Sequence, residues 1–168
     1  MQRRSLLALG VVSAAVLAVG GGLIAALQPG LREVRLSAGG REVFSGASRG
    51  LLDGSLPSGG AALERALEAL LERIDGLIAA LPPHAQSELS QLLALLASAG
   101  GRRALAGLSD PWPLASVADI QQALQGMRVS GLSLRQQAYQ ALHDIVGSAY
   151  FSDPQTWGLL GYPGPLKI

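Results

Sequence analysis

The feature of this sequence that most restricts its fold is the stretch over residues 61–83, which reads AALERALEALLERIDGLIAALPP. Its large apolar residues recur at steps of three and four, the spacing that places side chains on one side of an α-helix. They are Leu63, Leu67, Leu70, Leu71, Ile74, Leu77, Ile78 and Leu81. The proline pair at 82–83 ends the pattern. The stretch therefore predicts a long amphipathic helix whose apolar side must be covered by other elements.

The rest of the chain predicts further helices. Pro83 suits the first turn of a second helix, which we expect to stop at residues 100–101, a glycine pair. A third helix is expected to open at Ser116, with Asp119 supplying charge in its first turn, and a fourth near Ser133. Leu and Ala dominate the apolar residues, and both favour helices. We therefore predict an all-α fold, a small bundle of about four to five helices over residues 29–149.

The segment from Gln28 to Gly60 gives a weaker signal, because glycines are scattered through it. The alternation of Val34 and Leu36 before a glycine pair is compatible with a β-hairpin. The apolar residues between 43 and 51 instead follow helical spacing. We favour a short helix over about 41–52, ended near Gly54.

The first 28 residues have the layout of a secretory leader, two arginines followed by an uncharged stretch. Arg3 and Arg4, followed by Ser-Leu-Leu, indicate a twin-arginine (Tat) signal, a pathway that exports folded proteins. The apolar run is also long enough to span a bilayer, so an uncleaved membrane anchor remains an alternative to a cleaved signal. Either interpretation predicts a periplasmic protein.

Residues able to carry catalysis are few. The chain has no cysteine, which excludes disulfides, thiolate metal ligands and a cysteine nucleophile. His84 is expected at a helix start, where it either caps the helix or faces solvent. His143 and Asp144, as neighbours on a helix, are expected to point apart. There is no glycine-rich nucleotide motif after a strand, and a net charge of +1 without a basic stripe argues against nucleic-acid binding. We expect no catalytic, cofactor-binding or metal-binding residue in this chain.

The C-terminal segment, residues 150–168, holds four of the seven aromatic residues of the chain among prolines and glycines. Asp153 and Pro154 predict the start of one short helical turn that Gly161 ends, and the following residues should run extended. Such aromatic residues could close the end of their own bundle or bind another polypeptide. The candidate partner contacts are Tyr150, Phe151, Trp157, Tyr162, Pro163 and Pro165, with Trp112 as a weaker candidate.

Several pieces of the sequence together resemble a known family. They are the twin-arginine leader, GLLDGSLP at 50–57, the helix pair at 73–107, SLRQQAYQALHDI at 133–145, and the ending YFSDPQTWGLLGYPGP at 150–165. They resemble the small (gamma) subunits of periplasmic FAD-dependent sugar and alcohol dehydrogenases, including the gluconate 2-dehydrogenase subunit 3 type. The chain departs from the family in having Leu6-Leu7 after the arginines, where Phe-Leu is common, and in its extra glycines before residue 60.

The resemblance implies an accessory subunit without a catalytic role. In that family a large subunit of the glucose-methanol-choline type binds FAD and oxidises the substrate, and the small subunit escorts it through the Tat translocase. The expected partners are thus a large FAD-dependent subunit and the translocase, with FAD held by the partner. The alternative is a free-standing periplasmic helical protein that binds a small apolar ligand within its bundle.

Overall fold

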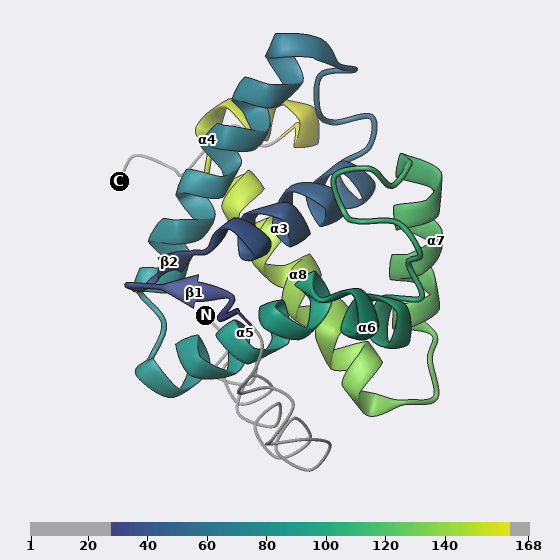
Figure 1. Cartoon of the computed structure of the whole chain (residues 1–168). Coiled ribbons are helices and arrows are strands. Elements are labelled where there is room, and N and C mark those ends of the chain that lie inside the picture. The colour runs from purple at the N-terminus through teal and green to yellow at the C-terminus, as the bar shows by residue number, and fades with distance from the viewer. Residues whose placement is uncertain (1–27, 162–168) are drawn as a thin grey trace.

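The computed structural model describes residues 28–161 and is mostly helical, which confirms the predicted all-α class (Figure 1). No helix within this range is long and apolar enough to cross a membrane. In chain order the elements are β1 (Leu31–Arg32), β2 (Arg35–Leu36), α3 (Ala38–Leu51), α4 (Gly60–Ala79), α5 (Pro83–Ala97), α6 (Ala99–Gly101), the π-helix η1 (Arg102–Ala106), α7 (Val117–Arg128), α8 (Ser133–Phe151) and the 3₁₀-helix η2 (Pro154–Leu160).

Helix α3 lies at the centre of the bundle and packs against α4, α5, α7 and α8 (Figure 1). The side chains of Val43, Phe44 and Ala47 are fully buried there. Ser37 begins the helix, because its hydroxyl accepts a hydrogen bond from the backbone N–H of Gly40. The predicted short helix is therefore present, but it starts earlier than expected and forms the core of the molecule.

Glycines in α3 allow neighbouring elements to approach its backbone closely. A Cβ atom at Gly46 would lie 2.8 Å from Cε3 of Trp112, and one at Gly50 would lie 2.6 Å from Cγ2 of Ile120. Both distances are too short for real atoms in contact. The glycines that weakened the helical signal in the sequence are thus the residues that let α7 and the loop before it pack against α3.

The β-hairpin considered for this segment is also present, immediately before α3. Strands β1 and β2 pair antiparallel, and the turn between them places Glu33 and Val34 at positive φ. The hairpin is attached to two helices, since Leu31 donates its N–H to the Ser90 hydroxyl and Leu36 donates its N–H to Asp75. The sequence presented hairpin and helix as alternatives, and the structure contains both in succession.

The other helices follow the predicted order, with one correction. The apolar stripe of α4 is buried at Leu67, Leu70, Leu71, Ile74 and Ile78. Ser116 caps α7 by accepting a hydrogen bond from the backbone N–H of Asp119, as expected. The glycine pair at 100–101 does not stop α5: the helix ends at Ala97, and Ser98 then caps α6 through the N–H of Gly101. The chain turns at Ser98 because its backbone is extended there.

Candidate partner-binding surface

The structure brings three of the predicted contact residues together at the C-terminal end of α8. Tyr150 and Phe151 form its last turn, and Trp157 lies on η2 directly afterwards. The short turn forms as the sequence predicts, because the Asp153 carboxylate accepts a hydrogen bond from the N–H of Gln155 and Gly161 ends the turn at a φ of 66°. Tyr162, Pro163 and Pro165 lie outside the described residues, as do Arg3 and Arg4 of the leader.

Tyr150 points into the bundle rather than outward. Its side chain is 7% exposed and belongs to the main apolar core. Its hydroxyl donates a hydrogen bond of 3.2 Å to the backbone oxygen of Ser55, which ties the end of α8 to the turn after α3. Tyr150 therefore fastens the base of the C-terminal segment and offers little surface to another protein.

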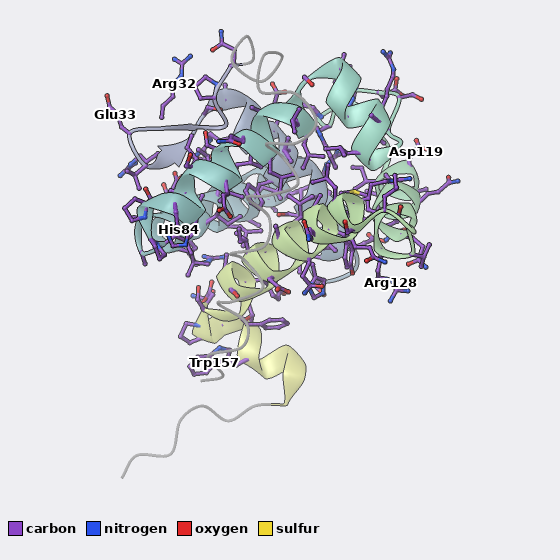
Figure 2. All side chains as sticks on the ribbon, turned by 90° about the horizontal axis from the view of Figure 1, so that it is seen from below. Arg32, Glu33, His84, Asp119, Arg128 and Trp157 are labelled. Carbon is purple, nitrogen blue, oxygen red and sulfur yellow. The ribbon has the colours of Figure 1, made fainter. Side chains whose placement is uncertain are left out.

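Phe151 and Trp157 present more surface. The Phe151 side chain is 43% exposed, and its ring meets the edge of the Tyr150 ring at a centroid distance of 5.2 Å. The Trp157 indole is partly buried and donates a hydrogen bond of 2.8 Å to the backbone oxygen of Phe151. Figure 2 shows Trp157 on the part of the molecule that extends beyond the bundle. Two aromatic faces are thus held side by side at one end of the fold.

An apolar groove of about 750 Å³ runs from Phe151 between α4 and α8. The large apolar residues that line it are Leu77, Ile78, Leu81, Ile145 and Phe151. His143 and Asp144 line it as well, eight and seven residues before Phe151 on α8. At 1.5 Å per residue, this places the histidine about 12 Å along the helix axis from Phe151. Phe151 lines the groove, and Trp157 is joined to it by the hydrogen bond to the Phe151 backbone oxygen. We call the groove together with these two aromatic residues the α8-end surface.

His143 and Asp144 are paired, which corrects the expectation that they point apart. His143 Nδ1 lies 3.1 Å from Asp144 Oδ1, and the same carboxylate oxygen accepts a hydrogen bond of 2.7 Å from Gln140. The two side chains bend toward each other across the helix surface, which Cβ directions alone do not reveal. Both are about half exposed, so the pair is a polar border of the groove and not a buried acid and base.

Trp112 is a core residue, and its proposed role as a partner contact was wrong. Its side chain is 1% exposed and lies over Gly46 of α3. Its indole N–H donates a hydrogen bond of 2.8 Å to the backbone oxygen of Leu96. The flanking prolines correctly predicted a loop, but this loop turns the tryptophan inward, where the missing side chain at position 46 leaves room for the ring.

The base of η2 is fixed to the bundle by polar contacts. On α4, Arg73 donates from Nε to the backbone oxygen of Ala149 at 3.0 Å, and its Nη1 lies 3.4 Å from Oδ2 of Asp153. The Thr156 hydroxyl, buried at this junction, donates to the backbone oxygens of Tyr150 and Asp153. Sequence reasoning missed Arg73, because it lies about 80 residues from the segment that it holds.

No other grouping in the described part of the chain suggests chemistry. Residues 28–161 contain no cluster of three or more histidine, aspartate or glutamate side chains arranged to hold a metal ion. His84 is exposed at the start of α5, as expected (Figure 2). Comparison of the chain with protein-family models, curated proteins and solved structures finds no match.

Proposed function

We propose that this chain is a non-catalytic accessory subunit that binds, stabilises and escorts a FAD-dependent large subunit of the glucose-methanol-choline type. One observation carries the proposal: Phe151 is 43% exposed where it lines an apolar groove, and the partly accessible Trp157 is hydrogen-bonded to its backbone oxygen. Aromatic residues with accessible faces at the edge of such a groove are typical of protein interfaces. The family resemblance of the leader and of residues 150–165 supplies the identity of the partner.

The α8-end surface has the chemistry of a docking site. Phe151 and the groove offer apolar area, while His143 and Asp144 provide polar groups at a border. Truncation of a central aromatic residue in such an interface typically costs about 2 kcal/mol or more of binding free energy. Residues 162–165 follow directly on η2 and would extend the same contact, because their prolines restrict the chain and lower the entropy lost on binding.

Binding of this kind would stabilise the large subunit by mass action. A protein that binds only the folded state of its partner adds about 2.7 kcal/mol to the partner's stability at a concentration one hundred times the dissociation constant. This matters for export through the Tat pathway, because its cargo crosses the membrane folded. FAD would supply the redox chemistry within the partner, and this chain would contribute shape and stability alone.

The proposal predicts that a neighbouring gene encodes a large flavoprotein without a leader, and it is tested by co-expression of the two chains followed by affinity capture of the complex. Trp157→Ala combined with Tyr162→Ala should weaken binding by roughly thirtyfold while leaving the helical content unchanged. Leu132→Ala is the matched control, since Leu132 is 66% exposed but precedes the opposite end of α8. Equal losses in both variants, or unfolding of the double variant, would contradict a dedicated interface at the C-terminal segment.

Export provides a second test. Replacing Arg3 and Arg4 by lysine should leave both chains in the cytoplasm, whereas continued export of the flavoprotein would contradict the escort role. An isolated gene and a failure to form the complex would favour the alternative, a free-standing periplasmic protein whose α4–α8 groove takes a small apolar ligand.

A further inference from the structure

The Arg73 guanidinium lies at the junction between the bundle and the C-terminal segment. Arg73 projects from α4 and contacts both sides of the junction, the end of α8 through the Ala149 carbonyl and the start of η2 through the Asp153 carboxylate. Its side chain is 28% exposed and that of Asp153 is 26% exposed, so both ends of the ion pair are largely shielded from water. Among residues 28–161 this is the ion pair that links η2 to the bundle.

The Asp153 carboxylate has two tasks, one for each oxygen. Oδ1 accepts the N–H of Gln155 and so caps η2, while Oδ2 faces Nη1 of Arg73. The orientation of the cap and the position of the arginine are therefore coupled. Apart from this link, η2 packs mainly against α8. Thr156 and Trp157 hold η2 to the end of α8, so the Arg73–Asp153 ion pair is the contact that ties this short 3₁₀-helix to α4.

Lysine could not reproduce this contact. The planar guanidinium donates from Nε to a carbonyl while its Nη1 forms an ion pair with a carboxylate, in directions fixed by its geometry. An ammonium group is a single point charge on a flexible chain. The position therefore requires an arginine for geometry as well as charge.

We propose that Arg73 is a positioning residue: acting through Asp153, it sets the direction in which η2 leaves the bundle and thereby presents Trp157 to a partner. The part concerning the partner rests on the proposed function, whereas the part concerning the direction of η2 does not. Trp157 lies shortly after the capping residue Asp153, and its indole N–H donates a hydrogen bond to the backbone oxygen of Phe151 at the end of α8. A change in the direction of η2 must therefore alter the surroundings of the indole.

The two tryptophans make this measurable in the full chain. Labelling with 5-fluorotryptophan gives two ¹⁹F signals, one from Trp112 in the core and one from Trp157 on η2, which Trp157→Phe assigns. In Arg73→Gln the Trp157 signal should shift or broaden while the Trp112 signal stays in place. Arg65→Gln is the matched control on the same helix, because within residues 28–161 the Arg65 side chain donates only to the Ala61 carbonyl of its own helix. Arg73→Lys should give an intermediate shift.

Asp153→Asn tests whether the arginine acts through this carboxylate, because asparagine also caps helices but lacks the charge. It should reproduce the effect of Arg73→Gln on the Trp157 signal. Adding Arg73→Gln to Asp153→Asn should change the signal little further. An additive effect, an unchanged Trp157 signal, or an equal change in Trp112 would overturn the positioning role.

Affinity for the large flavoprotein separates this inference from the proposed function. Arg73→Gln should weaken binding about tenfold, since side chains released from the junction must be ordered again on binding. Unchanged affinity with a shifted Trp157 signal would overturn the claim that the direction of η2 serves binding. If the wild-type chain does not bind the flavoprotein, the proposed function fails, and the fluorine signals still decide whether Arg73 directs η2.

Discussion

Helices α3 and α4 are adjacent in sequence and in contact. They differ in how clearly the sequence predicts a helix and in how far the fold encloses that helix. Helix α4 carries the clearest apolar stripe of the chain and covers one side of the bundle, with its other face in water. Helix α3 is rich in glycine, gives a weak signal, and is packed against four other helices. A stripe marks a helix that is buried on one side. A helix enclosed on several sides also needs small residues where its neighbours approach.

The largest expected effect concerns Trp112, which covers α3 at Gly46. Trp112→Ala should lower the free energy of unfolding by about 3–5 kcal/mol, because it opens a cavity beside the central helix. Trp112→Phe should cost less, about 1–3 kcal/mol, from the buried Leu96 carbonyl left without its donor. Leu63→Ala, at the partly exposed start of the α4 stripe, should cost less than Trp112→Ala in the same urea titration. If Trp112→Ala and Leu63→Ala lower the free energy of unfolding equally, the central helix α3 is no more sensitive to truncation than α4 at the side of the bundle.

A smaller effect is expected at Gly46 itself. Gly46→Ala should destabilise the protein by about 1–3 kcal/mol, since the added methyl group meets the Trp112 ring and overpacking outweighs the better helix propensity of alanine. Thermal unfolding followed by circular dichroism measures the change. An increase in melting temperature would show that the close approach at position 46 is not required.

The smallest effect has the opposite sign and sharpens the comparison. Gly76 lies on the exposed side of α4, and a Cβ atom there has nothing within 4 Å. Gly76→Ala should stabilise the protein by about 0.5–1 kcal/mol, because alanine loses less backbone entropy than glycine on folding. Chemical denaturation of Gly76→Ala and Gly46→Ala in parallel measures both changes in the free energy of unfolding. A loss of stability in Gly76→Ala would contradict the assignment of that face of α4 to solvent.

Much of the fold was predictable because its helices are bounded by local signals. The α4 stripe, the Ser116 cap and the Asp153–Pro154 start of η2 all depend on residues close together in sequence. The central position of α3 was not predictable, since the sequence does not show which neighbour fills the space beside a glycine. The end of α5 was misjudged for a related reason. Gly101 is needed because Leu95 O lies too close for a side chain, rather than to end a helix.

The candidate site was predictable in position but not in detail. The concentration of aromatic residues after residue 149 directed attention to the end of α8, where the structure places Phe151 and Trp157. Which rings turn inward depended on distant partners, such as Ser55 for Tyr150 and Leu96 for Trp112. The contacts of Arg73 and the groove between α4 and α8 form only when the two helices pack together. No local sequence pattern could therefore predict them.

The attachment of the hairpin to α5 has a geometric consequence for the position of the N-terminal end of the described residues. Gly30 donates its N–H to the Ser90 carbonyl, so the N-terminal end of the described residues lies beside α5. Figure 2 shows Arg32, near this end, and Trp157 on opposite sides of the molecule. The partner proposed for the α8-end surface would therefore leave the side of the molecule that holds Arg32 sterically accessible.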